Sequence, residues 1–216
     1  MTTITQHIAD IRQQLPADVQ LVCVSKFHPA PCITEAYNAG ERDFAESRVQ
    51  ELIPKHNELP KDIRWHFIGH LQTNKVKAIL PFIYLIQSVD SLRLLQVINT
   101  EAERIQRRIK VLIEVHVARE DSKTGFDPTE LPIHPEDYPW VEICGIMGMA
   151  TLTDDEQEIR RCFRELKTLA DRQPLSNNNQ QQPILSMGMS HDYPIAIQEG
   201  SNLVRIGTDI FGERQY

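Results

Sequence analysis

The sequence predicts an α/β protein folded as a single (β/α)8 (TIM) barrel that spans residues 1–216. Eight short apolar runs with β-branched residues recur along the chain, and helix-like segments lie between them. This alternation implies parallel strands joined by crossovers. The first run is followed by VSKFHPA, which lacks the glycine-rich turn of an open dinucleotide-binding sheet. A closed barrel is therefore favoured over an open doubly wound sheet.

The predicted strands follow one another at residues 21–25, 43–47, 65–69, 83–89, 111–117, 141–149, 183–189 and 203–208. Helices are predicted over 31–40, which ends at a glycine, over 89–109 after an Asp-Ser start, and over 151–172 after a Thr-Asp start. The segment SNNNQQQ at 176–182 is interpreted as a solvated loop, and residues 208–216 are a candidate short helix. A barrel of 216 residues must have short loops.

Composition excludes several classes of protein. The formal net charge of −7 argues against a nucleic-acid binder and against adhesion to anionic membranes. The N-terminus resembles no signal peptide and no run is long enough to span a membrane, so a cytoplasmic protein is predicted. The four cysteines form no CxxC pair. His66 and His70 are four residues apart in a segment predicted as a strand and not as a helix, so no metal site is expected.

In a barrel of this kind the active site lies at the carboxyl ends of the strands. Those positions are occupied by Lys26, Glu46, Ser47, Gly69, His70, Met147, SMGMS at 186–190 and RIGT at 205–208. Lys26 is the most informative of them. Desolvation at the barrel mouth lowers the pKa of a lysine, and a neutral amine can form a Schiff base with an aldehyde. The alternative is a lysine that extends from a strand end into water.

The last two strand ends suggest a phosphate site. SMGMS supplies hydroxyls and a glycine, and RIGT supplies a guanidinium, a glycine and a hydroxyl. Barrels often bind phosphate at the loops after strands seven and eight. The alternative is that Gly188 and Gly207 serve only tight packing and that the serines cap turns. A Schiff-base lysine opposite a phosphate site suggests pyridoxal 5′-phosphate (PLP) as the cofactor.

The chain resembles the pyridoxal-phosphate homeostasis protein family, whose fold is similar to the N-terminal barrel of alanine racemase. The resemblance rests on VSKFHPA, WHFIGHLQTNK, SVDSLRLL, EDSKTGF, GIMGMAT, LSMGMSHDYPIAIQEGSNLVRIGT and IFG. It implies that Lys26 carries PLP as an internal aldimine and that Ser190, Gly207 and Thr208 bind the phosphate. It also implies that Ser186 and Met187 lie next to the cofactor, and that Arg205 lies near the pyridine nitrogen or the phosphate.

The chain departs from the family pattern in three places. AES replaces the usual GEN after the second strand, so Ser47 stands where an asparagine is expected near the ring. GHLQ replaces GPLQ, which puts His70 in place of a proline, and His116 and Ala118 replace an asparagine and a serine. These changes affect the predicted contacts with the ring face and leave the lysine and the phosphate ligands intact.

The resemblance implies a carrier or regulator of vitamin B6 supply, which holds PLP in an open, exchangeable site and has no robust catalytic activity. The alternative is a weak PLP-dependent amino-acid racemase, and a cofactor-free Schiff-base aldolase is a third possibility. The chain ends eight residues after Thr208, so we expect no second domain of the kind that helps complete the racemase site. Cofactor-free PLP enzymes are the expected acceptors, and a monomer is predicted.

Overall fold

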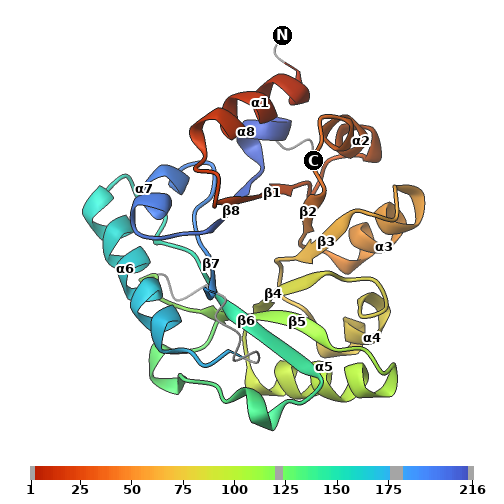
Figure 1. The fold of residues 1–216 in the computed structure, drawn as a ribbon, viewed down its shortest axis with the longest axis vertical. Coiled ribbons are helices and arrows are strands. Elements are labelled where there is room, and N and C mark those ends of the chain that lie inside the picture. The colour runs from red at the N-terminus through yellow and green to blue at the C-terminus, as the bar shows by residue number, and fades with distance from the viewer. Residues whose placement is uncertain (1–2, 120–123, 176–181, 214–216) are drawn as a thin grey trace.

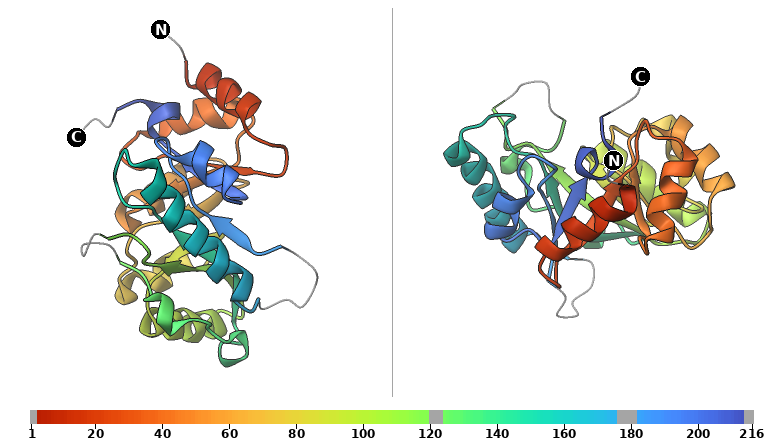
Figure 2. Two further views of the ribbon diagram at one scale, coloured as in Figure 1. Left: turned by 90° about the vertical axis from the view of Figure 1, so that its left-hand side faces the viewer. Right: turned by 90° about the horizontal axis from the view of Figure 1, so that it is seen from above.

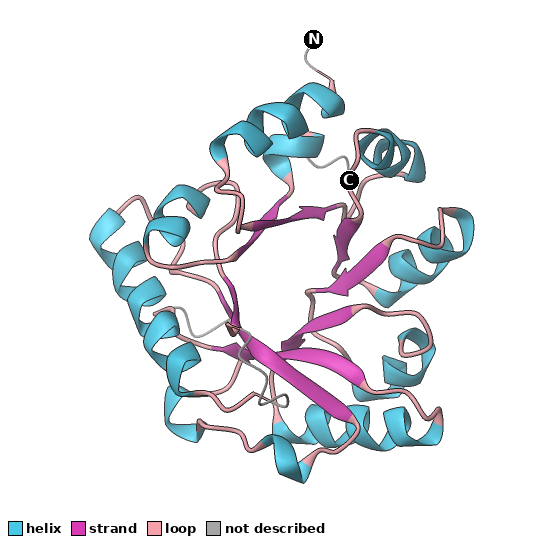
Figure 3. Ribbon diagram, viewed as in Figure 1, coloured by secondary structure: helices cyan, strands magenta, loops and turns pink. Residues whose placement is uncertain are grey.

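Eight parallel strands close into a barrel in the order in which they occur along the chain. Figure 1 shows the strands as a ring with the helices outside it, and Figure 3 separates the two layers by colour. The ring closes where β8 pairs with β1, with Arg205 opposite Val22. This computed structural model describes residues 3–119, 124–175 and 182–213. The predicted (β/α)8 barrel is confirmed.

The strands are short, as parallel barrel strands usually are. They are β1 Gln20–Val24, β2 Asp43–Glu46, β3 Arg64–Phe67, β4 Leu85–Val89, β5 Ile109–Val115, β6 Val141–Gly148, β7 Ile184–Ser186 and β8 Leu203–Ile206. The seventh strand is shorter than the predicted 183–189, because the chain turns at Gly188, where φ is +94°. A Cβ atom at that position would lie 2.6 Å from the Cβ atom of Ala196, so only glycine fits the turn.

The α-helices are α1 Ile4–Gln14, α2 Ala30–Asn38, α3 Val49–Glu58, α4 Val76–Ile79, α5 Leu92–Arg104, α6 Glu156–Arg172, α7 Tyr193–Gln198 and α8 Thr208–Phe211. The first and last of them lie side by side in Figure 1, and Nδ1 of His7 lies 2.9 Å from the carbonyl oxygen of Ile210. In the left view of Figure 2, α6 and α7 share one side of the barrel, and Arg160 and Arg164 of α6 both donate to Glu199 after α7.

All four predicted helices differ from the structure at their ends. The predicted helix 31–40 is Ala30–Asn38, and the predicted helix 89–109 is Leu92–Arg104, which is capped by the side chain of Ser91. The predicted helix 151–172 begins only at Glu156, because the side chain of Asp155 caps it by accepting from the backbone N–H of Gln157. The predicted helix 208–216 is helical over Thr208–Phe211, and residues 214–216 lie outside the described residues. Most of the predicted loop at 176–182 also lies outside them, since 176–181 are not described.

The core has two layers. Large side chains such as Trp65, Phe67 and Phe163 fill the space between strands and helices. Inside the barrel lie smaller apolar clusters from the strands alone, with Val22 and Ala45 in one and Leu85 in the other. Buried polar side chains also occupy this interior, which is unusual because barrel interiors are commonly filled by branched apolar residues. No helix in the described parts of the chain is both long and apolar enough to cross a membrane.

Candidate functional site

A cavity of about 330 Å³ opens at the carboxyl ends of the strands. Five of the predicted site residues line it, namely Lys26, Ser190, Arg205, Gly207 and Thr208. Lys26 reaches it because it lies two residues beyond β1, in step with the inward-facing Val22 and Val24. The remaining lining is largely apolar and comes from Val24, Ile68, Met147, Met149, Leu152 and Met189. The barrel therefore brings the predicted amine and the predicted phosphate ligands to one cavity.

Three other predicted site residues do not line this cavity. Ser47 lines an adjoining cavity of about 180 Å³, together with His70 and Lys75. Ser186 is fully buried, and its hydroxyl group is hydrogen-bonded to two other side chains inside the barrel. Met187 is buried in the layer between strands and helices, where its N–H donates to Leu203 and its carbonyl accepts from Ser201. Contacts of these three residues with PLP stay predictions.

Charged side chains hold the backbone on both sides of Lys26. Lys55 of α3 donates to the carbonyl oxygen of Ser25 over 3.0 Å and to Glu46 over 2.8 Å. The hydroxyl of Ser25 donates to the same Glu46 oxygen over 2.7 Å. On the other side, the N–H of Phe27 donates to Glu51 over 2.9 Å. We call Ser25, Glu46, Glu51 and Lys55 the anchor cluster.

The anchor cluster offsets a strained backbone next to Lys26. Phe27 has φ of +68°, in the left-handed region that costs a residue with a Cβ atom about 1–2 kcal/mol. The hydrogen bond to Glu51 holds this conformation, and the guanidinium of Arg48 lies 4.7 Å from the centre of the Phe27 ring. Because the turn is held from two sides, Lys26 leaves the strand in a defined direction.

Burial is the largest influence on the pKa of Glu46. Glu46 is fully buried, and burial raises the pKa of its carboxyl above the ordinary value although Lys55 and Ser25 act in the opposite direction. Its second oxygen, Oε2, has no hydrogen-bond partner. The pair of Glu46 and Lys55 is therefore held in place by charge at a considerable cost in desolvation.

Arg205 lies at the floor of the cavity and is 4% exposed. One terminal nitrogen donates to the carbonyl and the hydroxyl oxygens of Ser186 over 2.8 and 2.5 Å, and the other donates to the carbonyl oxygen of Gly148 over 3.0 Å. Burial lowers the pKa of the guanidinium to about 10, so it remains a cation at neutral pH. Glu114 is buried nearby, and burial raises the pKa of its carboxyl.

The loops at the ends of β7 and β8 are tied to each other. The N–H of Arg205 donates to the carbonyl oxygen of Gly188 over 3.0 Å, and the N–H of Asp209 lies 3.4 Å from the hydroxyl oxygen of Ser190. The side chain of Asp192 accepts from the N–H of Met189 over 2.7 Å. These bonds hold Ser190 beside the first turn of α8, where Thr208 lies.

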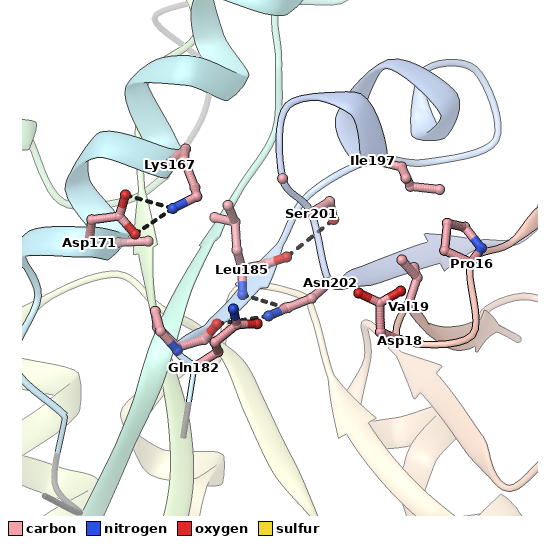
Figure 4. Close-up of a pocket in the computed structure, with 13 residues that line it drawn as sticks. Pro16, Asp18, Val19, Lys167, Asp171, Gln182, Leu185, Ile197, Ser201 and Asn202 are labelled. Atoms are coloured by element: carbon pink, nitrogen blue, oxygen red, sulfur yellow. Dashed lines mark hydrogen bonds and ion pairs between the residues drawn. The ribbon is translucent and has the colours of Figure 1, made fainter. Parts of the chain in front are cut away.

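A larger cavity, of about 470 Å³, lies at the other end of the strands (Figure 4). Asn202 in its lining joins β7 to β8, because it donates to the carbonyl oxygen of Pro183 over 2.9 Å and accepts from the N–H of Leu185 over 2.8 Å. Lys167 at its edge is paired with Asp171 over 2.5 Å. In barrels the amino-terminal face serves stability, and these contacts fit that role.

The two histidines of WHFIGH have separate partners. His66 lies inside the barrel between Gln87 and Asp43, whereas His70 lies at the surface, 2.7 Å from Asp90. The described residues contain no group of three or more side chains suited to a metal ion. Sequence reasoning missed the buried polar residues of the interior. Their signal was present, since His66 and Gln87 each interrupt an apolar strand.

Comparisons with known proteins found a matching family, similar proteins and solved structures of the same fold. The chain matches the family described as alanine racemase, N-terminal domain, over residues 1–215. A pyridoxal phosphate homeostasis protein of Aquifex aeolicus is 41% identical over 201 residues, which cover 91% of this chain and 88% of that protein. The structure of PipY from Synechococcus elongatus without PLP has a TM-score of 0.87 at 37% identity, and that with PLP bound has 0.83 at 38%. Both cover 97% of this chain and 100% of PipY.

Proposed function

This chain belongs to the pyridoxal phosphate homeostasis protein family, and we propose that it holds PLP on Lys26 in the cavity at the carboxyl ends of the strands. Membership of the family confirms the predicted role in PLP homeostasis and the predicted cofactor. The observation that supports the assignment of Lys26 is its position in one cavity with Ser190, Thr208 and Arg205. The roles of the individual residues are our proposal.

The residues of the cavity fit PLP. A volume of about 330 Å³ lies in the range of small-molecule sites. The donor set also matches, because an amine lies in the same cavity as two hydroxyl groups, and methionine side chains supply a polarizable surface for a flat ring. When bound, PLP supplies an aldehyde that reacts with amines and a ring that can accept electrons.

Each residue then has one task. Lys26 supplies the amine, and the anchor cluster sets the direction in which that amine leaves the strand. Ser190, Gly207 and Thr208 bind the phosphate. Arg205 faces the pyridine nitrogen rather than the phosphate, because its guanidinium is held at the buried floor by Ser186 and Gly148. The phosphate ligands Ser190, Gly207 and Thr208 lie at more exposed positions after β7 and β8.

The position of Arg205 favours a carrier over a racemase. A fixed cation next to a ring nitrogen raises the free energy of the protonated ring, and the protonated ring is the form that accepts electrons well. The mouth of the cavity is open to solvent, since Leu152 on its rim is 79% exposed. A site of this kind suits binding and release of PLP. We further propose that the protein is a cytoplasmic monomer that supplies cofactor-free PLP enzymes.

The assignment is tested by the absorbance of lysine-bound PLP in the purified protein. Lys26→Ala should abolish the band, whereas Lys75→Ala, which changes a lysine of the adjoining cavity, should retain it. Free pyridoxal, which lacks the phosphate, should bind roughly ten- to a hundredfold more weakly, as expected for the loss of a hydrogen bond to a charged group. A full band in Lys26→Ala would refute the assignment. Turnover of small amino acids near the median enzyme rate of about 10 per second would favour the racemase instead.

A further inference from the structure

A chain of hydrogen-bonded side chains crosses the inside of the barrel, from Arg205 to the opposite end of the strands. Arg205 donates to the hydroxyl of Ser186 over 2.5 Å, and Ser186 donates to Oε1 of Gln87 over 2.7 Å. The amide nitrogen of Gln87 lies 2.9 Å from Nδ1 of His66, and Nε2 of His66 lies 3.1 Å from Asp43. Because β4 and β7 are not neighbours in the ring, the bond between Gln87 and Ser186 spans the interior. We call these five residues the interior chain.

The hydrogen bonds of the interior chain all point away from Arg205. A guanidinium can only donate, so the Ser186 oxygen accepts from it and gives its own proton to Oε1 of Gln87. The NH2 group of Gln87 then faces His66, so Nδ1 accepts and the ring proton lies on Nε2, where it is donated to Asp43. The arrangement therefore admits one orientation of Gln87 and one tautomer of His66.

The far end of the interior chain is a fixed anion. Arg64 donates to both oxygens of Asp43, over 2.7 and 2.5 Å. Burial raises the pKa of the Asp43 carboxyl, but the hydrogen bonds from His66 and Arg64 outweigh burial and hold the pKa well below its ordinary value. The interior chain thus runs from a cation, Arg205, at the cavity to an anion, Asp43, at the other end of the strands. The charges at its two ends maintain the direction in which its hydrogen bonds are donated.

We propose that the interior chain positions the guanidinium of Arg205 against PLP, a role that rests on the proposed function. A buried polar network adds less stability than apolar packing unless each member is satisfied. Here Gln87 and His66 are each hydrogen-bonded to both of their neighbours in the interior chain. The interior chain ends at Arg205, the one arginine among the described residues that lines the cavity. Gln87 and His66 are therefore positioning residues, although neither lines the cavity.

The first experiment is ¹⁵N NMR of the His66 ring at neutral pH in protein without PLP. The wild type should carry a proton on Nε2 alone. Gln87→Glu keeps the shape of the side chain but replaces the NH2 group by an acceptor, so His66 must bind a second proton to keep the contact. The variant should show both ring nitrogens protonated. A wild-type ring with its proton on Nδ1 would overturn the direction of the chain and the inference with it.

The second experiment measures PLP retention and the absorbance band in Gln87→Leu, with Leu85→Val as the matched control. Leu85 lies on the same strand and the same inward face, but outside the interior chain. Gln87→Leu should bind PLP roughly tenfold more weakly and shift the band, because Arg205 loses its support. Leu85→Val should lose a comparable amount of thermal stability, but its PLP binding and its absorbance band should equal those of the wild type.

The outcomes separate the two proposals. Equal PLP binding and equal spectra in Gln87→Leu and Leu85→Val would overturn the inference and leave the proposed function standing. A wild-type protein that binds no PLP would overturn the proposed function, and the positioning role with it.

Discussion

The two ends of the cavity are supported in different ways. The anchor cluster lies outside the barrel wall, between β2 and α3, and combines Glu46, Glu51 and Lys55 as charged groups. The interior chain lies inside the barrel and places neutral side chains between its two charged ends. Glu46 has an unpartnered oxygen, whereas the neutral members of the chain bond in both directions. The lysine end is thus held by charge, and the arginine end by directional hydrogen bonds.

The same contrast appears in the pKa directions of the two buried carboxyl groups. Burial raises the pKa of Glu46, and its cationic partner only partly offsets this. Burial also raises the pKa of Asp43, but there the hydrogen bonds from His66 and Arg64 prevail, and the pKa is held below its ordinary value. The contribution of Asp43 to stability should therefore increase as the pH rises, and that of Glu46 should decrease.

The largest expected effect comes from breaking the anchor cluster. Lys55→Met should reduce the free energy of unfolding by about 3–5 kcal/mol, because it leaves Glu46 buried without a counter-ion. Lys167→Met removes the cation of an exposed pair with Asp171 and should cost less than about 1 kcal/mol. Urea unfolding of both variants measures the difference. Equal losses would show that the anchor cluster is no stronger than a surface ion pair.

A smaller effect should appear in the pH dependence of stability. Asp43 stabilises the fold above its unfolded pKa of about 3.9, and this contribution is lost as the pH falls through the lowered native pKa. Glu46 contributes below its unfolded pKa of about 4.3, and this contribution is lost as the pH rises through the raised native pKa. Asp43→Asn should therefore flatten the acid side of the stability curve, and Glu46→Gln the side toward neutral pH.

Urea unfolding across this pH range gives the two slopes. If Asp43→Asn and Glu46→Gln change the slope of the free energy of unfolding against pH in the same direction, the two ends of the cavity do not differ in the way described.

The smallest effect concerns the strained turn after Lys26. Phe27→Gly relieves a φ of +68° but loses the contact with Arg48, so the stability should change by less than about 1 kcal/mol. Gln106→Gly relieves a φ of +52° at a turn and loses only an exposed hydrogen bond from its side chain to the carbonyl oxygen of Glu103. It should stabilise the protein by up to about 1 kcal/mol. Thermal unfolding measures the stability of both variants. A large loss of stability in Phe27→Gly alone would mean that the contact between the Phe27 ring and Arg48 contributes more than the backbone strain costs.

Much of the site could be predicted from the sequence because its signals are local. Lys26 stands at the end of an apolar strand, and the hydroxyls and glycines of the last two strand ends stand in short recognisable segments. A barrel brings strand ends together, so these residues share a cavity as predicted. Ser186 and Met187 do not line this cavity, because one turns into the interior and the other into the outer core, and their contacts with PLP stay predictions.

The sequence alone predicts the alternation of strands and helices, the closed barrel, the family and the place of Lys26 at a strand end, because each depends on residues close together in the chain. Which buried polar side chains meet depends on the folded barrel, because these residues lie far apart in the chain. Ser186 and Gln87 are separated by 99 positions, and they touch because the closed ring places β4 and β7 across a narrow interior. Glu51 and Lys55 are spaced like an exposed helical pair, and the packing of α3 against the end of β1 turns them into support for Lys26.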